Sequence, residues 1–326
     1  MTNVEILTAE YLYDSFDGCP SCHASSVAEA TDGALVAGCF AGSKESAEDT
    51  KVLISRKGRG AEHWETRVLW DEPGHAAGNV RLFRRPDGDL QIIYPLNFGA
   101  WCRGGSRHFQ HTSADGGKTW SDQRPIPCER PFLGKNAPIQ LQDGSLVLPV
   151  KMEGKAKEAR QTSAALISTD GGDTWELSTE DIDSVDGASV IQPAAVELRS
   201  GDLLFLLRSD AGRIYRTTSG DGGRTWQPAQ PTEMPNNHSG IDVVGLADGR
   251  FLLVCNPVAE TWGPRSPLTV SISDDGGDTW CPLTTLEDQK GEYSYPTVIQ
   301  TRDGLVHITY TYRRQRIKHV VLRLGT

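Results

Sequence analysis

One short segment near the start of the chain has the spacing of a cofactor site, Cys19-Pro20-Ser21-Cys22-His23. Its C-x-x-C-H pattern is that of covalent haem attachment, and its C-x-x-C part is that of a dithiol redox pair. Haem attachment needs a compartment that a chain without a visible N-terminal signal is not expected to reach. No second C-x-x-C completes a zinc site, although His23 and a distant ligand could. We therefore expect no cofactor and no metal here, but two reduced thiols near a strand start.

A wider set of polar residues recurs at matching positions along the chain. Six apolar segments each begin with a polar or aromatic side chain, 8 to 11 residues before a regularly spaced glycine. The residues at these starts are His23, Asn79, Asn136, Gln192, His238 with Asp242, and Tyr293 with Tyr295. If the six segments begin around one axis, their polar side chains form a funnel that could hold a ligand. The chemistry then depends on an architecture that brings the six starts together.

The first of two repeats is a turn motif with four near-identical copies. The copies are SADGGKTW (113–120), STDGGDTW (168–175), SGDGGRTW (219–226) and SDDGGDTW (273–280). Their tryptophans lie 55, 51 and 54 residues apart, and a degraded copy at 55–64 places Trp64 another 56 residues upstream. In such a segment the Asp accepts backbone N–H groups and the glycines supply positive φ, which predicts a hairpin turn.

The second repeat is a turn followed by an apolar strand, and it alternates with the first. Its glycines are Gly33, Gly88, Gly144, Gly201, Gly249 and Gly304. Six units of roughly 50 to 57 residues fill the chain, without long helical periodicity. This spacing predicts an all-β fold, a six-bladed β-propeller that forms a single domain over 1–326. We expect the N-terminal strand 4–13 and the C-terminal strand 317–324 to close the ring.

Composition narrows the classes of partner. Lys and Arg total 33 against 43 Asp and Glu, a formal charge of −10, which argues against nucleic acid and against an anionic membrane surface. An anionic ligand would therefore need a local arginine cluster. No apolar run reaches the length of a membrane span, and the seven cysteines are odd in number and mostly isolated. We expect a soluble, cytoplasmic protein with reduced thiols, and leave its oligomeric state open.

The turn motif is the Asp-box, and with the six-unit layout the chain resembles the sialidase (neuraminidase) superfamily of six-bladed propellers. The Asp-box itself stabilises the outer part of a blade and also occurs in propellers without catalytic activity. It is therefore weak evidence for activity. The resemblance implies an arginine triad that binds the substrate carboxylate, a nucleophilic tyrosine paired with a glutamate, and an aspartate as general acid. It implies no cofactor.

Several of these roles can be carried over to residues of this chain. Arg208 resembles the second arginine of the triad and Arg265 the third, and each guanidinium could bind a carboxylate through two parallel hydrogen bonds. Tyr293 in EYSYP resembles the nucleophile, with Tyr295 as its possible substitute. Asp49 in AEDTKVLIS resembles the general acid, and its neighbour Glu48 could take the same place.

Two positions depart from the pattern of the superfamily. His23 stands where the first arginine is expected, and Gln192 stands where the glutamate that assists tyrosine ionisation is expected. An amide cannot accept the proton of the phenol, which leaves the sialidase form of nucleophilic catalysis in question.

These residues support three hypotheses. The first is an exo-acting glycosidase that cleaves a terminal sugar from an acidic, carboxylate-bearing oligosaccharide. The second is an oligosaccharide lyase that eliminates at a uronic acid, as in sialidase-like rhamnose–glucuronate lyases, with His23, His238 or a tyrosine as base. The third is a propeller that binds glycans without catalysis, stacking sugars on Trp101, Trp262 and Tyr295. Released saturated sugar or an unsaturated uronate distinguishes the first two.

Overall fold

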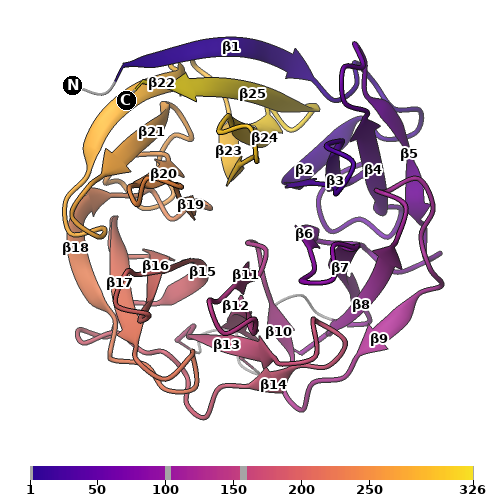
Figure 1. Ribbon diagram of the computed structural model, residues 1–326. Coiled ribbons are helices and arrows are strands. Elements are labelled where there is room, and N and C mark those ends of the chain that lie inside the picture. The colour runs from indigo at the N-terminus through magenta and orange to yellow at the C-terminus, as the bar shows by residue number, and fades with distance from the viewer. Residues whose placement is uncertain (1–2, 100–103, 155–159, 326) are drawn as a thin grey trace.

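Six antiparallel sheets stand around one axis (Figure 1). The computed structural model of the chain describes residues 3–99, 104–154 and 160–325. Every regular element in these residues is a β-strand. The predicted all-β, six-bladed propeller is therefore confirmed.

The first three blades follow one another along the chain. Blade I is β2 (Ser21–Glu29), β3 (Leu35–Gly42), β4 (Lys51–Lys57) and β5 (Glu65–Trp70). Blade II is β6 (Arg81–Arg84), β7 (Leu90–Asn97), β8 (Ser106–Ser113) and β9 (Arg124–Ile126). Blade III is β10 (Phe132–Leu133) and β11 (Ile139–Gln140), which both pair with β12 (Leu146–Met152), then β13 (Ser163–Ser168) and β14 (Glu176–Leu177).

The remaining blades complete the ring. Blade IV is β15 (Val190–Glu197), β16 (Leu203–Ser209), β17 (Arg213–Ser219) and β18 (Gln230–Pro235). Blade V is β19 (Asp242–Gly245), β20 (Phe251–Cys255), β21 (Leu268–Ser273) and β22 (Cys281–Glu287). Blade VI is β23 (Tyr293–Gln300), β24 (Val306–Tyr312), β25 (Arg316–Leu324) and β1 (Val4–Tyr11).

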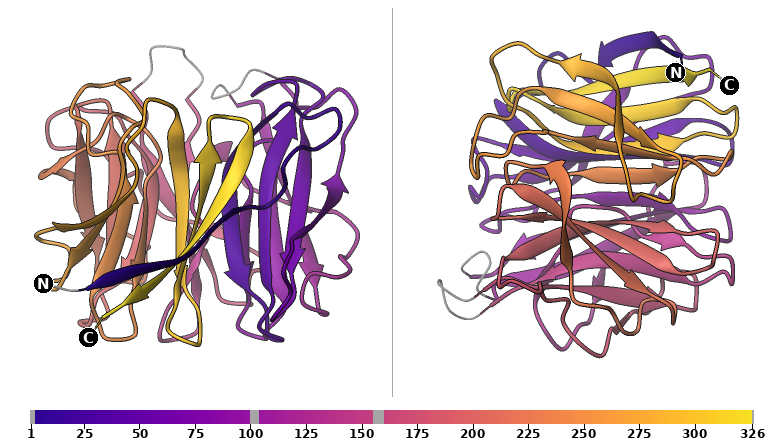
Figure 2. Two further views of the ribbon diagram at one scale, coloured as in Figure 1. Left: turned by 90° about the horizontal axis from the view of Figure 1, so that it is seen from above. Right: turned by 90° about the vertical axis from the view of Figure 1, so that its left-hand side faces the viewer.

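The two ends of the chain close the ring in blade VI. Strand β1 pairs antiparallel with β25, with Val4 opposite Leu324 and Tyr11 opposite Lys318. The two strands run side by side along the outer side of the blade (Figures 1 and 2). The predicted pairing of the terminal strands is therefore confirmed.

The Asp-boxes form the hairpin turns between the third and fourth strands of four blades. In the copy between β21 and β22, the Asp275 carboxylate accepts hydrogen bonds from the backbone N–H groups of Asp278 and Thr279 and from the Ser273 hydroxyl. Gly276 and Gly277 have φ of 80° and 86°, as this turn requires. The tryptophan that ends each of the four boxes packs against the core between two blades.

The hydrophobic core is divided into clusters that lie between neighbouring blades. Blades I and II, for example, meet through Val36 and Ile54 on one side and Ile92 and Leu82 on the other. Because each inner strand is covered on both faces, the inner strands read as nearly continuous apolar runs. Polar side chains on these strands are concentrated where the strands begin, near the axis.

The cysteine pair of the C-x-x-C segment is buried between blades I and VI. Cys19 and Cys22 are both free thiols. Burial raises the pKa of the Cys22 thiol to about 11, so it stays protonated at neutral pH. Within the described ranges, no three His, Cys, Asp or Glu side chains are grouped to hold a metal ion, and no helix could span a membrane.

Candidate active site

Three inner strands carry a β-bulge where they approach the axis. The pairing register shifts between His23 and Ser26 in β2, between Ile191 and Ala194 in β15, and between Ser294 and Thr297 in β23. The first bulge residues have positive φ, at 53° for Ala24, 49° for Gln192 and 53° for Tyr295. A bulge redirects the side chain that it carries. Here it directs Gln192 and Tyr295 into an axial cavity.

The cavity has a volume of about 370 Å³ and is lined from all six blades. Its charged walls are Glu45, Lys151, Arg208, Arg265 and Arg314. Four basic side chains against one acidic side chain make a site for an anion, although the chain as a whole is acidic.

Arg208 and Tyr295 form the floor of the cavity. Arg208 Nη1 donates to the phenol oxygen of Tyr295 at 2.8 Å and to Oε1 of Gln192 at 2.9 Å, and its Nη2 donates to the backbone carbonyl of His238. Burial lowers the pKa of the Arg208 guanidinium from its ordinary value. The phenol and the amide of Gln192 are therefore both acceptors for one cation.

A network of ion pairs runs along the wall beside Tyr295. Glu292 Oε1 accepts from Arg265 Nη1 at 2.6 Å and from Arg314 Nε at 2.6 Å. Arg314 Nη1 also donates to Glu45 Oε2 at 2.5 Å. Burial by itself would lower the pKa of Arg314, but Glu45 and Glu292 outweigh it and raise that pKa. The shared carboxylate thus holds two guanidinium groups together at the cavity wall.

The electrostatics of the site favour ionisation of Tyr295. Burial by itself raises the pKa of the phenol, but the positive charges of Arg208 and Arg265 outweigh it, so that pKa lies below its ordinary value. The guanidinium carbon of Arg265 lies 5.5 Å from the ring centroid, and that of Arg208 lies 5.7 Å from it. A phenolate in this position could act as a nucleophile.

Comparison with known proteins identifies the family of this chain. A family model described as a BNR repeat-like domain matches residues 33–308. The chain belongs to this family, within the sialidase superfamily. Its residues are 29% identical to a sialidase of Micromonospora viridifaciens over 221 positions, which are 61% of this chain and 32% of that protein. The match therefore spans about a third of that relative's length.

Solved structures show the same fold at low identity. A protein of unknown function from Dyadobacter fermentans has a TM-score of 0.82 at 18% identity, over 98% of this chain and 99% of that one. The Hadza microbial sialidase Hz136 has a TM-score of 0.81 at 17% identity, over 98% of this chain and 68% of that one. These likenesses establish the propeller fold.

In this BNR-repeat propeller, His23 lies behind Tyr295 and is not part of the cavity wall. The two rings are 4.2 Å apart between centroids, and Nδ1 of His23 is 2.8 Å from the hydroxyl of Thr311. Burial, followed by the charge of Arg314, holds the pKa of His23 well below its ordinary range. His23 is therefore neutral and shielded from the cavity, which corrects the expectation that it contacts substrate.

An arginine from a turn of blade VI lies beside the place where the first arginine was expected. The backbone N–H of Cys22, next to His23, donates to the carbonyl of Arg314 at 2.8 Å. The side chain of Arg314 lines the cavity from the turn between β24 and β25. The propeller thus keeps three arginines at the cavity, Arg208, Arg265 and Arg314.

Tyr293, the preferred nucleophile of the sequence analysis, points away from the cavity. Its hydroxyl accepts from Arg313 Nη2 at 3.1 Å, and its ring packs against Tyr312. In a regular strand, two residues that are two positions apart face the same side. The bulge breaks this regularity at Tyr295, so Tyr295 faces the axis whereas Tyr293 does not. The alternative, Tyr295, is the tyrosine that lines the cavity.

The expected acid Asp49 is also replaced by a neighbour. Both oxygens of Asp49 accept from the backbone N–H of Ser43, and Oδ1 also accepts from its hydroxyl at 2.9 Å, so the carboxylate stabilises the loop before β4. Glu48, the second expected acid, is absent from the cavity walls, whereas Glu45 of the same loop lines the cavity.

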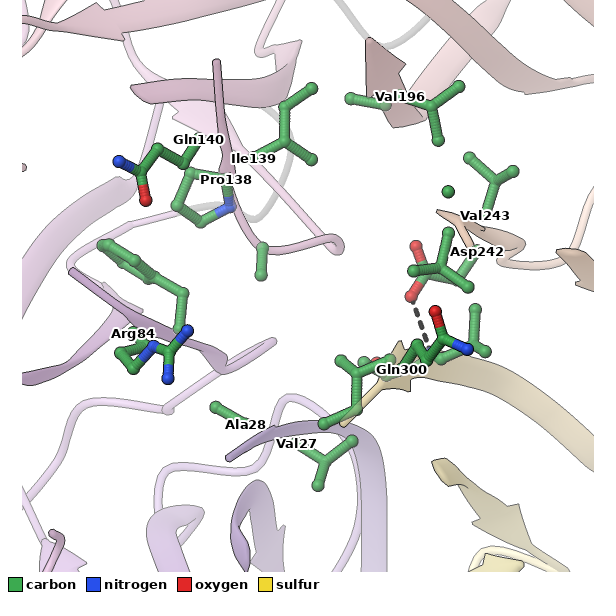
Figure 3. A pocket seen from close by; sticks show the side chains of 18 of the residues that line it. Val27, Ala28, Arg84, Pro138, Ile139, Gln140, Val196, Asp242, Val243 and Gln300 are labelled. Carbon is green, nitrogen blue, oxygen red and sulfur yellow. Dashed lines mark hydrogen bonds between the residues drawn. The ribbon is translucent and has the colours of Figure 1, made fainter. Parts of the chain in front are cut away.

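Two further expected residues lie elsewhere. Asn136 is buried. Its Oδ1 accepts a hydrogen bond from Lys135, and its Nδ2 donates one to the carbonyl of Pro193. Asp242 lines a second cavity of about 450 Å³, where the inner strands end, and its Oδ2 accepts from the backbone N–H of Val298 at 2.9 Å (Figure 3). Burial raises the pKa of Asp242 above its ordinary value. Neither residue can contact a ligand at Tyr295.

The other expected binding residues divide between the cavity and the undescribed part of the chain. Asn79 and His238 line the cavity, as Gln192, Arg208 and Arg265 do. Burial, followed by the charge of Arg208, lowers the pKa of His238 to about 3, so its ring is neutral. Trp262 stands over the His238 ring at 4.8 Å and is 72% exposed. Trp101 lies outside the described residues.

Sequence reasoning missed Glu45, Arg314 and Lys151 as cavity residues. Arg314 lies in a basic run at 312–319, and Glu45 lies four residues from the expected acid. The loops that carry Glu45 and Arg314 could have been predicted from the blade layout, because both loops connect strands at the end of the propeller where the inner strands begin. The directions of the two side chains could not have been predicted.

Proposed function

We propose that the protein is an exo-acting glycosidase that hydrolyses the bond of a terminal, carboxylate-bearing sugar. The observation that carries this proposal is the hydrogen bond from Arg208 to the Tyr295 phenol within a cavity that has two further arginines. A binding protein would have no need of a tyrosine whose pKa is lowered by two cations. The sialidases among the relatives support the same class of reaction.

The substrate carboxylate would bind at Arg265 and Arg314. Both guanidinium groups are held by Glu292 and both line the cavity. Burial raises the pKa of Glu292, but the charges of Arg265 and Arg314 outweigh it and lower that pKa, so Glu292 stays ionised as a fixed support. Two orientated guanidinium groups can bind one carboxylate through parallel hydrogen bonds.

Tyr295 would be the nucleophile. Its phenolate oxygen forms a bond to the anomeric carbon as the glycosidic bond breaks, and the bonding electrons pass to the leaving oxygen. Gln192 cannot take the phenol proton as a glutamate would. The positive charges of Arg208 and Arg265 lower the pKa of the phenol, so its proton can pass to solvent before substrate binds.

Glu45 would be the general acid. In the free protein it is paired with Arg314. A substrate carboxylate on Arg314 competes for that guanidinium and releases Glu45, which would take a proton from solvent and donate it to the leaving oxygen. In the second half of the reaction Glu45 takes a proton from the water that releases the sugar from Tyr295, and the anomeric configuration is retained.

The size of the cavity suits a single terminal sugar. About 370 Å³ lies at the small end of the range for ligand pockets. Trp262, exposed beside His238 at the cavity wall, offers an aromatic face on which the next sugar could stack. The acidic sugar would therefore occupy the cavity and the remainder of the glycan would extend toward solvent.

The test is incubation with a panel of oligosaccharides that end in a sialic acid, a keto-deoxy sugar acid or a uronic acid. Hydrolysis releases a saturated acidic monosaccharide, which is read by mass. The Tyr295→Phe variant provides the control for contaminating activity. An activated fluorosugar of the best substrate class should add one sugar mass to the peptide that contains Tyr295.

The same panel tests the lyase and the binding protein. Elimination yields an unsaturated uronate that absorbs in the ultraviolet, and binding yields no product. His23 is no longer a candidate base for the lyase hypothesis, because it is buried behind Tyr295. Ultraviolet-absorbing product from the wild type, without release of a saturated sugar, would show elimination and reject hydrolysis.

A further inference from the structure

Each of the three bulges leaves a backbone carbonyl that accepts a hydrogen bond from a side chain of another blade. The carbonyl of Pro193, after Gln192, accepts from Asn136 Nδ2 at 2.8 Å. The carbonyl of Pro296, after Tyr295, accepts from Lys135 Nζ. The carbonyl of Ser25, in the third bulge, accepts from the Thr297 hydroxyl at 2.7 Å. The second bulge residue thus has a cross-blade partner in all three cases.

Two of these partners are consecutive residues of blade III. Lys135 Nζ also donates to the Asn136 side chain at 2.7 Å and to the carbonyl of Ile241 at 3.1 Å. Lys135 and Asn136 are 2% and 3% exposed. The pair therefore joins blade III to blades IV, V and VI near the axis, next to the backbone that carries Gln192 and Tyr295.

A lysine fits this position because of its donors. An ammonium group has three N–H donors, and here it has three oxygen acceptors, from Asn136, Ile241 and Pro296. Burial lowers the pKa of Lys135 to about 8, whereas the charge of Asp242 acts to raise it. A buried cation is costly unless its hydrogen bonds are satisfied, so this arrangement depends on the carbonyls staying in place.

The backbone that is held here is otherwise unfavourable. Gln192 and Tyr295 have φ of 49° and 53°, a region that residues other than glycine rarely adopt. Such conformations persist when surrounding contacts hold them. We propose that Lys135 and Asn136 are positioning residues, which hold the two bulges so that Tyr295 and Gln192 face Arg208.

This proposal rests on the proposed function only for its kinetic consequences. Neither Lys135 nor Asn136 lines the cavity, so neither contacts substrate. They act through the backbone next to Tyr295 and Gln192. Loss of the Lys135 ammonium should let the Tyr295 bulge relax, lengthen the bond from Arg208, and raise the pKa of the phenol toward its ordinary value.

The experiment compares Lys135→Met with Gln91→Met. Lys135→Met keeps the length of the side chain and removes the donors to Pro296. Gln91→Met also removes a buried side-chain donor to a carbonyl of another blade, that of Gly172, but this bond lies at an Asp-box turn and not at a bulge. The Tyr295 phenol is titrated by NMR of carbon-13-labelled tyrosine, with its signal assigned from Tyr295→Phe.

We expect the Tyr295 titration to shift upward in Lys135→Met and to stay at the wild-type position in Gln91→Met. On the best acidic substrate, kcat of Lys135→Met should fall by about 100-fold with little change in KM, as for a misplaced catalytic group. Lys135→Arg, which restores a cation and its donors, should recover part of both losses.

The NMR titration separates this proposal from the proposed function. An upward shift in a protein that cleaves no acidic sugar would support the positioning role and reject the glycosidase. An unchanged Tyr295 titration in folded Lys135→Met overturns the positioning role, whatever the activity. If Lys135→Met does not fold, Asn136→Ala tests the second bulge through the same titration, since Gln192 shares Arg208 Nη1 with Tyr295.

Discussion

Arg208 Nη1 lies 2.8 Å from the phenol oxygen of Tyr295 and 2.9 Å from Oε1 of Gln192. The amide cannot take a proton from the phenol, so the phenol and the amide do not form an acid–base pair. Both oxygens instead accept hydrogen bonds from the same guanidinium nitrogen. The nucleophile would be activated by positive charge rather than by a carboxylate. The predictions below follow from this difference.

Tyr295, not Tyr293, should be essential. Tyr295→Phe keeps the ring and removes the nucleophilic oxygen, and we expect kcat/KM to fall by about 1,000-fold or more. Tyr293→Phe removes only the bond to Arg313 outside the cavity and should keep activity within about threefold. Steady-state kinetics of both variants check this, and the reverse order of effects would return the nucleophile to Tyr293.

The pH profile should depend on Arg265. Because the cations lower the pKa of Tyr295, the phenolate fraction rises with pH through a value below the ordinary one near 10. Arg265→Met removes one of these charges, so the rising limb of kcat/KM should move to higher pH. The measurement is kcat/KM across pH with an activated aryl glycoside, whose departure needs no acid. An unmoved limb would mean that another group controls it.

Arg314 should bind the carboxylate of the substrate. We expect Arg314→Met to raise KM between about 10-fold and 100-fold, the worth of hydrogen bonds to a charged group. Conversion of the substrate carboxylate to an amide should cost less affinity in the variant than in the wild type, because only Arg265 is left to bind that carboxylate. Arg316→Met, in the same basic run but paired with Asp14 at the surface, is the matched control. Equal effects of both variants would indicate a general loss of positive potential.

Glu45 should supply the proton to the leaving group. Glu45→Gln should lower kcat by about 100-fold to 10,000-fold on natural glycosides. Aryl glycosides with acidic phenols need no proton, and their cleavage should be nearly normal. Asp49→Asn, on the same loop, should not show this dependence on the leaving group. The measurement is kcat against the pKa of the leaving phenol; a flat plot for Glu45→Gln removes Glu45 from the role.

The Asp-box carboxylates should contribute to stability above acidic pH. Hydrogen bonds from Thr279 lower the pKa of Asp275 to about 2 from 3.8 in the unfolded chain. The unfolded state binds the proton first, so this contribution is full above about pH 4 and is lost as pH falls toward 2. Asp275→Asn should cost about 1 kcal/mol at pH 7 and less at pH 2.5. Asp274→Asn is the adjacent control, and thermal unfolding at both pH values measures the difference.

The blade layout could be predicted from the sequence because turn chemistry is local. The Asp-box needs its aspartate, serine and glycines within a few residues, and each apolar strand follows a turn glycine. The spacing of these signals therefore determined six blade units and the pairing of 4–13 with 317–324. The inward polar starts at Asn79, Gln192 and His238 followed from the same register.

Only the tertiary structure decided which side chains reach the cavity. The bulge at Tyr295 and Pro296 shifts the register, so Tyr295 lines the cavity and Tyr293 packs outside it. The loop before β4 uses Asp49 to bind its own backbone, and Glu45 reaches the cavity in its place. Such choices depend on backbone directions set by contacts between blades, which local sequence does not encode.

The sequence by itself thus determined the propeller, its closure and the end of the axis where polar groups gather. The tertiary structure decided that Arg314, Arg265 and Arg208 surround Tyr295, and that His23 lies behind its ring. The physical reason is that strand spacing depends on neighbours along the chain. A binding cavity instead depends on six strand starts held in place by contacts such as those of Lys135, across 161 positions of sequence to Pro296.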